Sequence, residues 1–255
     1  MSDTVFPLTR ERHGNKFWLR VRDFGFSREV TAVPLAAAEL SRAAVALPMG
    51  FATIGEETTL VAIVGLERGK NLFVAPDGRW IAPYVPAMLR GHPFRLGHGP
   101  DGEAVLCVDE SSDCFVGPTS GGIPFYAEDG GAHEETRKVL DFLVATQKSV
   151  GQLKRAVAAL EAKNVLAPWN ASLDNGAGKL AFSGYSRVSE EALAKLSDAD
   201  YLYLRKEGAI PVAYSQLLSS AHIGALGKLT ELHAKHQGQG KGLFDLTDSD
   251  TIRFN

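Results

Sequence analysis

The sequence has few cysteines, no excess of positive charge and no long hydrophobic run. Two cysteines in 255 residues are too few for a fold held together by disulfides. Lysine and arginine total 27 against 30 acidic residues, and the net charge of -3 supplies no cationic surface for a phosphate backbone. Apolar runs such as residues 59–66 fall far short of the roughly 20 residues that a membrane helix needs. We therefore expect a globular protein that neither binds nucleic acid nor spans a membrane.

The amino terminus carries charged residues where a secretory signal would need an apolar segment. This pattern predicts a cytoplasmic protein, with surface export by another route as the alternative. A chain kept in the cytoplasm normally holds its thiols reduced, so Cys107 and Cys114 are expected to be free. Their spacing would also suit a disulfide across a hairpin, which is the alternative.

The first half of the chain alternates short apolar runs with turn residues. Residues 17–22 and 59–66 read as strands, and residues 34–47 read as a helix with Pro34 in its first turn. Glycine and proline clusters then interrupt residues 72–125 and prevent any long helix there. At most two helical turns are expected, over residues 83–90.

The pattern changes abruptly at His133, where one long amphipathic segment begins. Its apolar side chains recur alternately four and three positions apart, at Val139, Leu143, Thr146, Val150, Leu153, Val157 and Leu160. This spacing predicts a helix of about 30 residues over 133–164, roughly 45 Å long. Gly151 inside it predicts a bend or a closely packed neighbour. The stripe is expected to pack within the chain, and a homodimer formed through the 133–164 helix is the alternative.

The last third of the chain reads as a hairpin followed by helices. Residues 167–188 predict the hairpin, with its turn at 174–176, and Ser189 is placed to cap the next helix. Two short helices and a longer one from Val212 to about His236 are expected after it. The predicted fold is α+β, or mixed α/β, with a strand- and loop-rich part at 1–132, a helical part with the inserted hairpin at 133–236, and a linker and tail at 237–255. A single compact domain is the alternative.

Three sequence motifs that would indicate a catalytic or cofactor-binding site are incomplete or absent. In the run from Gly65 to Lys70, only three residues separate the two glycines, whereas a phosphate-binding loop needs four. Asn71 then follows in place of the required serine or threonine. The sequence around Ser186 lacks the second glycine of a nucleophile elbow. No glycine-rich dinucleotide fingerprint follows a strand. We therefore expect no nucleotide or redox cofactor, and no serine hydrolase of the elbow type.

Several potential metal ligands occur without the spacing of a known metal site. His92, His98, Cys107 and Cys114 fall within 23 positions, but structural zinc sites favour ligand pairs two to four residues apart. His233 and His236 lie three apart on the last predicted helix without an accompanying glutamate motif. No metal site is expected.

A cluster of polar and aromatic residues lies between residues 79 and 113 and is the best candidate for a binding site. Three carboxylates follow an apolar run that ends at Val108, and arginines and aromatic residues precede it. Carboxylates placed in this way act as acid and base, bind a cation, or pair with Arg79, Arg90 or Arg95 and only fix loops. The candidate ligand-binding residues are Arg79, Trp80, Tyr84, Arg90, His92, Asp109, Glu110 and Asp113.

The order of several segments resembles the SapC family of bacterial proteins. The resemblance is carried by PLTRERHG at 7–14, FGFSREVTAVPL at 24–35, NLFVAPDGRW at 71–80 with YVPAMLRGHPF, LCVDESSD and GIPFYAEDG, and it extends over about residues 7–232. The family is named for surface-layer loci and offers no catalytic residues to transfer to this chain. Its gene neighbourhoods, with outer-membrane receptors, flavoproteins and cupin-like oxygenases, imply a role in the uptake or modification of a peptide or carbohydrate.

The leading hypothesis is a non-catalytic accessory protein that binds an unknown peptide, glycan or protein partner and serves a cell-surface or nutrient-uptake system. One alternative is a hydrolase or transferase of a peptide or carbohydrate in which Asp109, Glu110 or Asp113 acts as acid and base, with His92 as a further participant. Another is a structural, self-associating protein related to surface layers. Enzymatic activity is the less favoured of these readings because no complete catalytic signature is present.

Overall fold

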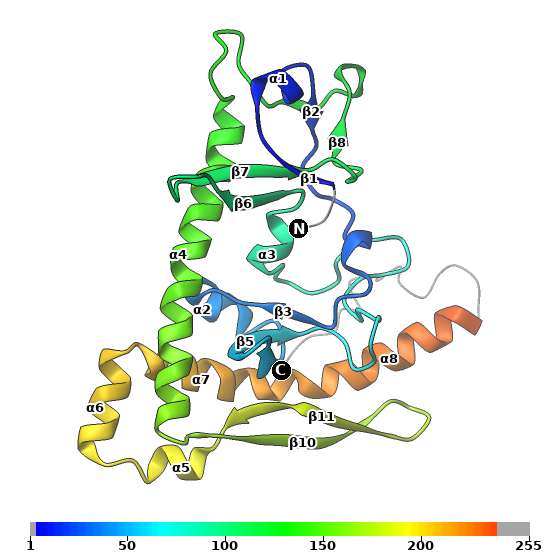
Figure 1. Cartoon of the computed structure of the whole chain (residues 1–255). Coiled ribbons are helices and arrows are strands. Elements are labelled where there is room, and N and C mark those ends of the chain that lie inside the picture. The colour runs from blue at the N-terminus through cyan, green and yellow to red at the C-terminus, as the bar shows by residue number, and fades with distance from the viewer. Residues whose placement is uncertain (1–3, 239–255) are drawn as a thin grey trace. The chain divides into compact units, whose positions relative to one another are not determined.

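The computed structural model describes residues 4–238 and combines helices with antiparallel sheets, so the predicted α+β class is confirmed (Figure 1). Packing divides the chain into two compact units. The first unit comprises Met1–Arg22 and Ala87–Lys148, and the second comprises Asp23–Pro86 and Ser149–Asn255. These two units are defined by packing in space. The division at His133, which was predicted from the change in sequence pattern, stays a prediction. The expected linker and tail lie mostly at 239–255, outside the described residues.

The first unit is built on two small antiparallel sheets, ordered β1-β7-β6 and β8-β2-β9. Its elements are β1 (Val5–Pro7), α1 (Arg10–His13), β2 (Phe17–Trp18), α3 (Ala87–Arg90), β6 (Phe94–His98), β7 (Ala104–Asp109), β8 (Phe115–Val116), a 3-10 turn at Pro118–Ser120, β9 (Ile123–Pro124) and the beginning of α4 (Glu134–Ala162). The strand expected over 17–22 is present but shortened to two residues, and the apolar run that ends at Val108 forms β7. Of the one or two helical turns expected over 83–90, the four-residue α3 is present.

Aromatic rings form the core of the first unit. Trp18 and Phe94 meet edge to face with their ring centroids 5.0 Å apart, and Leu106, Val108 and Phe125 complete the buried cluster. The first part of α4 covers this cluster with apolar side chains at 139, 140 and 143. Burial of these large rings is the main source of stability in a unit whose sheets are short.

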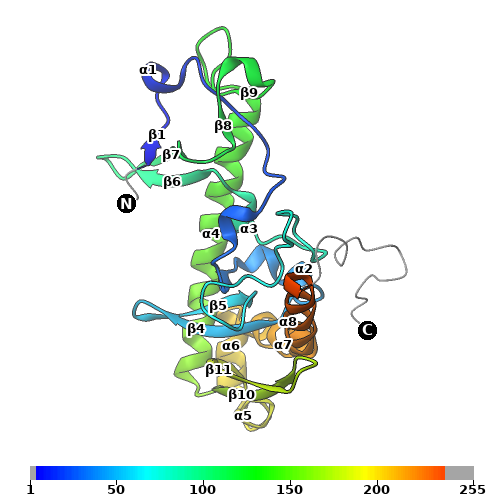
Figure 2. The same cartoon turned by 90° about the vertical axis from the view of Figure 1, so that its right-hand side faces the viewer.

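The second unit contains one five-stranded antiparallel sheet, ordered β10-β11-β4-β5-β3. Its elements are a 3-10 turn at Gly25–Ser27, β3 (Ala32–Pro34), a 3-10 turn at Ala37–Glu39, α2 (Leu40–Ala43), β4 (Met49–Ile54), β5 (Glu57–Ile63), the rest of α4, β10 (Leu166–Asp174), β11 (Lys179–Val188), α5 (Glu190–Ala194), α6 (Asp198–Lys206), α7 (Ala209–Ser219), a 3-10 turn at Ser220–His222 and α8 (Ile223–Gly238). Figures 1 and 2 show α7 and α8 running beside the β10–β11 hairpin.

Helix α4 confirms the long helix predicted from the apolar stripe. Leu153, Val157 and Leu160 are at most 3% exposed in the second unit, so the stripe packs within the chain as expected. The side chains that would form a dimer seam are thus used internally, and the homodimer stays a prediction. The close neighbour expected at Gly151 is absent within the described part of the chain, because no heavy atom lies within 4 Å of a Cβ built there.

The predicted hairpin and helix caps are also present. Strands β10 and β11 pair antiparallel, and residues 175–178 form the turn between them, where the turn was expected at 174–176. The Ser189 hydroxyl accepts a hydrogen bond from the Ala192 backbone N–H at 3.2 Å, and Ser197 does the same for Asp200 at 3.1 Å. Each cap satisfies a backbone donor that the first helical turn leaves unpaired.

Two predicted helices are wrong in extent. Pro34 does not begin a helix but lies in β3, opposite Val61 of β5, and only a 3-10 turn and the four-residue α2 follow it. Burial of Val33 and Leu35 beside the sheet favours extended backbone over the helix that local propensity suggested. The last helix is interrupted after Ser219.

Hydrogen bonds from serine side chains explain the break between α7 and α8. The hydroxyls of Ser219 and Ser220 both donate to the Gln216 carbonyl, at 2.7 and 3.1 Å. A serine side chain that bonds to the carbonyl of the preceding turn competes with the helical ladder. The Ser219 hydroxyl also accepts the Met49 backbone N–H at 3.1 Å, which ties the break to β4.

Gln216 links three elements of the second unit from a fully buried position. Its side-chain oxygen accepts the Val188 backbone N–H of β11 at 2.8 Å, and its amide nitrogen donates to the Met49 carbonyl of β4 at 3.2 Å and to Ser220. It thereby satisfies backbone groups of two sheet strands that no water can reach.

We expect Gln216→Ala to lower the free energy of unfolding by about 2 to 4 kcal/mol, because the Val188 N–H and the Met49 carbonyl would be buried without partners. Urea denaturation followed by circular dichroism measures the change. Gln152→Ala is the control, since Gln152 is exposed on a helix of the same unit. Equal stabilities of the two variants would contradict this role for Gln216.

Gly151→Ala should raise the free energy of unfolding by about 0.5 to 1 kcal/mol, because alanine favours helix and the added methyl group meets no neighbour among the described residues. The same urea titration tests this expectation. A destabilised variant would show that α4 needs the conformational freedom of glycine at this position.

Candidate functional site

The eight residues predicted for the binding site belong to two groups, one in each unit. The first unit contains Arg90, His92, Asp109, Glu110 and Asp113, and the second contains Arg79, Trp80 and Tyr84. Their selection as ligand-binding residues stays a prediction. The contacts within each unit show which of them already have protein partners.

Glu110 follows the end of β7 and is bound by two side chains of α1. Arg12 donates to both of its carboxylate oxygens, and the Nε2 atom of the fully buried His13 lies 3.1 Å from Oε1. The hydrogen bond from Arg12 holds the pKa of Glu110 below its usual range. Arg12 also lies over the Phe6 ring, with 3.6 Å between its guanidinium carbon and the ring centroid. Glu110 therefore pairs with Arg12, which is not among the three arginines expected from the sequence as partners of the carboxylates.

Asp109 closes β7 and lies in the same turn. Its Oδ1 accepts hydrogen bonds from the backbone N–H and the hydroxyl of Ser111, at 3.1 and 2.6 Å. Burial alone would raise the pKa of Asp109, but hydrogen bonds from Ser111 and Thr4 outweigh it and hold that pKa below its ordinary value. Asp113 is exposed in this turn.

His92 lies beside the same turn, because the antiparallel pairing of β6 with β7 brings the residues before β6 close to those after β7. Its Nε2 atom is 2.6 Å from the Ser112 hydroxyl oxygen. Burial lowers the pKa of His92, although the charges of Asp109 and Asp113 act in the opposite direction. Arg90, at the end of α3, lies over the Phe142 ring of α4 at 5.1 Å. The structure thus brings His92 together with two of the predicted carboxylates.

The three predicted residues of the second unit fix one loop. Trp80 stacks on Phe73 and donates from its ring nitrogen to the Tyr84 carbonyl at 2.8 Å. The Tyr84 hydroxyl donates to the buried carboxylate of Glu39 at 2.7 Å. Arg79 forms an exposed ion pair with Asp77, two residues away. These contacts give Trp80 and Tyr84 a structural role in the loop.

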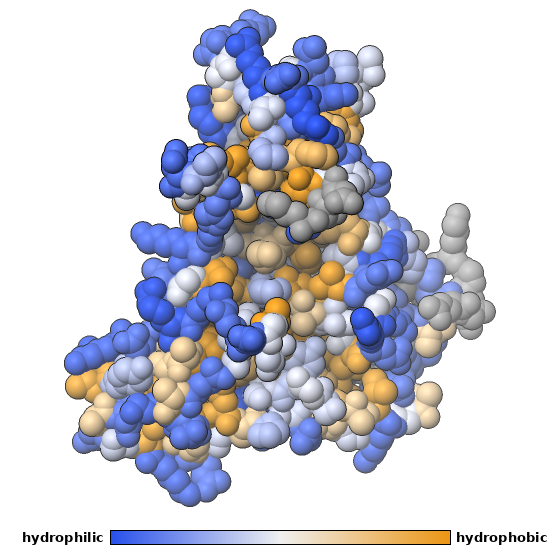
Figure 3. Space-filling model, viewed as in Figure 1, coloured by the Kyte–Doolittle hydropathy of each residue, from blue (hydrophilic) through white to orange (hydrophobic). Residues whose placement is uncertain are grey.

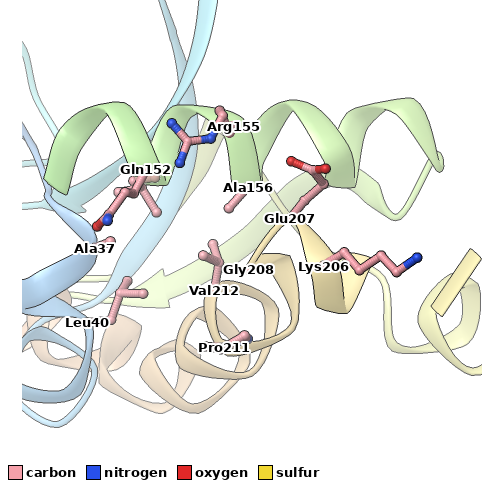
Figure 4. Close-up of a pocket in the computed structure, with 11 residues that line it drawn as sticks. Ala37, Leu40, Gln152, Arg155, Ala156, Lys206, Glu207, Gly208, Pro211 and Val212 are labelled. Carbon is pink, nitrogen blue, oxygen red and sulfur yellow. The ribbon is translucent and has the colours of Figure 1, made fainter. Parts of the chain in front are cut away.

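A pocket of about 360 Å³ lies elsewhere in the second unit, where α4 meets the junction of α6 and α7. Leu40, Leu153 and Val212 are among its apolar lining residues, and Arg155 and Glu207 are among its charged ones. Figure 4 shows Arg155 near Gln152 at one end of the pocket and Glu207 towards the other, with Lys206 extending away from the centre. The pocket therefore has apolar lining residues, with the cation Arg155 towards one end and Glu207 and Lys206 towards the other.

Comparison with known proteins gives one match. The model of the SapC family matches residues 8–226. The chain belongs to the SapC family. No curated protein and no solved structure matches this SapC-family chain. The family assignment confirms the resemblance carried by the sequence segments, and it leaves substrate, partner and activity to be argued from the structure.

The polar residues of the pocket gave no signal in the sequence of this SapC-family protein. Arg155 reads as the solvated face of a long helix, and Glu207 followed by Gly208 reads as a helix end. No sequence motif surrounds Ser112. Only the packing of α4 against the α6–α7 junction brings Arg155 and Glu207 to one pocket, and only the pairing of β6 with β7 brings Ser112 to His92.

Other features bear on the class of site. Among residues 4–238, no group of three or more histidine, cysteine, aspartate or glutamate side chains is placed to hold a metal ion, and no helix is long and apolar enough to cross a membrane. Both thiols are free, with Cys107 buried and Cys114 partly exposed.

Large apolar side chains are exposed on the helices next to the pocket, at Tyr201, Leu202, Tyr203, Tyr214 and Leu218. Figure 3 shows hydrophobic residues at the surface over α6, at the lower left.

The pairing of Glu110 predicts a stability that depends on pH. Because its pKa is lower in the folded protein than its ordinary value of 4.5, the ion pair stabilises the fold above that pH, and the contribution is lost as the pH falls through the lowered pKa. Glu110→Gln should therefore be less stable than wild type at about pH 7, with the difference shrinking at about pH 3. Urea denaturation at both values measures it. Glu128→Gln, an exposed substitution in the same unit, controls for the lost charge. A difference that does not change with pH would refute the assignment.

Proposed function

We propose that the second unit of this SapC-family protein is a binding module that takes a short apolar peptide, with free amino and carboxyl ends, in its pocket. As a cytoplasmic accessory protein it would serve a surface or uptake system, which is the context that the family resemblance implies. The observation that carries the proposal is a concave site with apolar lining residues, in which Arg155 and Glu207 lie apart from each other.

The size and lining of the pocket support a small amphipathic ligand. Its volume of about 360 Å³ lies at the lower end of the range found for ligand sites, about 300–1,000 Å³. Ala37 is half-buried and Pro211 is exposed, so they present apolar surface to an occupant beside the buried Leu153 and Val212. An apolar side chain placed against them would leave water, which is the general source of affinity in such sites.

The charges at the two ends support a ligand that carries both signs. Arg155 can bind a carboxylate with two parallel hydrogen bonds, and Glu207 can accept hydrogen bonds from an ammonium group. Within residues 4–238, neither side chain takes part in an ion pair with the protein. A zwitterionic peptide offers both groups, whereas a neutral glycan offers neither.

Catalysis by the predicted carboxylates draws less support. Glu110 is already bonded to Arg12 and His13, and Asp109 to Ser111. A carboxyl group that acts as a general acid or base works best with its pKa raised towards the working pH. The pKa values of both carboxyl groups are instead lowered. Self-assembly draws less support as well, since the apolar stripe of α4 is packed within the chain.

Three matched ligands test the proposed binding. Leucyl-leucine carries both charges, N-acetyl-leucyl-leucine lacks the ammonium group, and leucyl-leucinamide lacks the carboxylate. We expect each blocked form to bind the wild-type protein about tenfold more weakly than the free dipeptide, since a hydrogen bond to a charged group contributes about 1.5 kcal/mol or more. Isothermal titration calorimetry measures the three dissociation constants.

Variants assign each end of the ligand to one residue. Arg155→Gln should abolish the preference for a free carboxylate and keep the preference for a free amine, and Glu207→Gln should do the reverse. Arg68→Gln, an exposed arginine of the same unit, is the control and should keep both preferences. Equal binding of all three ligands to wild type, or binding of none, would reject the proposal.

A further inference from the structure

The turn after β7 in the first unit contains a hydroxyl group and an imidazole in direct contact. Ser112 Oγ lies 2.6 Å from His92 Nε2, which is within the distance of a strong hydrogen bond between a nucleophile and its base. The two residues are 20 positions apart, and the antiparallel register that pairs Phe94 with Val108 brings them together. This contact is independent of the pocket in the second unit.

Backbone hydrogen bonds hold Ser112 in one orientation. The Phe115 backbone N–H donates to the Ser112 carbonyl at 2.9 Å, and the Ser112 N–H donates to the Asp109 carbonyl at 3.3 Å. The Cys114 backbone N–H donates to the Ser112 hydroxyl oxygen at 3.1 Å. Because that oxygen accepts from Cys114, its own proton is available for donation to His92. The hydroxyl is thus fixed on a tight turn, and it donates to Nε2 when the ring carries its proton on Nδ1.

The surroundings of His92 favour the neutral ring that a general base requires. Partial burial lowers the pKa of His92, while the nearby charges of Asp109 and Asp113 moderate the effect. Both His92 and Ser112 are only partly buried, and Ser111 and Asp113 on either side of Ser112 are exposed. The turn that contains Ser112 therefore borders solvent.

We propose that Ser112 is a nucleophile activated by His92 and that the first unit catalyses acyl transfer from small carboxylic esters to water. Ser112 Oγ forms a bond to the ester carbonyl carbon as its proton passes to His92 Nε2. The bond from that carbon to the alcohol oxygen then breaks, and His92 returns the proton to the departing alcohol. Water attacks the acyl-serine in the second half, giving one proton to His92, which restores the Ser112 hydroxyl as the carboxylic acid leaves. The activity goes beyond the proposed peptide binding and uses none of the residues of the pocket.

A fluorophosphonate probe tests the nucleophile without knowledge of the natural ester. The serine oxygen attacks phosphorus, fluoride leaves, and a stable adduct forms that intact-protein mass spectrometry detects and peptide mapping locates. We expect one adduct, on Ser112, and none in Ser112→Ala. His92→Gln should slow labelling by about 100-fold or more, because general-base assistance contributes at least that factor. Ser111→Ala, which changes the exposed neighbouring hydroxyl, should be labelled at the wild-type rate.

Circular dichroism and thermal unfolding show whether each variant is folded, so that a change in labelling rate can be assigned to the substituted side chain. Should His92→Gln fail to fold, Ser112→Ala with the wild-type protein still decides the question, since it removes a single oxygen atom. Absence of labelling in wild type, an adduct on another serine, or undiminished labelling of Ser112→Ala would each overturn the proposal. Arg68→Gln, an exposed substitution in the second unit outside the pocket, should be labelled like wild type. Labelling and peptide binding are measured separately, so a failure of one leaves the other untouched.

Discussion

Burial of the apolar stripe of α4 is the constraint on which the rest of the structure depends. A helix of this length with one apolar face is unstable in water until that face is covered, since most helical stability in proteins comes from tertiary packing. Its first part covers the aromatic cluster of the first unit, and Leu153, Val157 and Leu160 enter the core of the second unit. Each unit therefore owes part of its core to the same helix, and the sequence on either side of α4 supplies the sheets that complete it.

The distribution of charge separates structural residues from candidate functional ones. Glu110 is bonded to Arg12 and contacts the ring of the buried His13, which ties α1 to the turn after β7 and leaves little capacity for a ligand. Arg155 and Glu207 line a concave surface and have no ion pair among the residues described here, so their charges are available to an occupant. The hydroxyl of Ser112 contacts a base instead of a counter-ion. Paired charges stabilise a fold, whereas binding and catalysis need a charge or a base that faces an open position.

Local sequence predicted the elements whose signals are local. The stripe of α4, the β10–β11 hairpin and the Ser189 cap depend on residues within a few positions of one another, and all three are present. Prediction failed where distant partners outweighed propensity. Pro34 joins a sheet because Val61 pairs with it, and the last helix breaks because Ser219 bonds to both α7 and β4. No window of sequence around either residue contains the partner that decides its conformation.

The same distinction holds for function. The sequence by itself determined the α+β class, the SapC-family membership and the turn at 109–113 as a place where polar groups gather. Only the tertiary structure decided which of those groups already have partners, and it alone brought His92 to Ser112 and Arg155 to the same pocket as Glu207. The physical reason is that a site is a set of short distances between residues far apart in the chain. Such distances follow from sheet register and helix packing, which no motif in this sequence encodes.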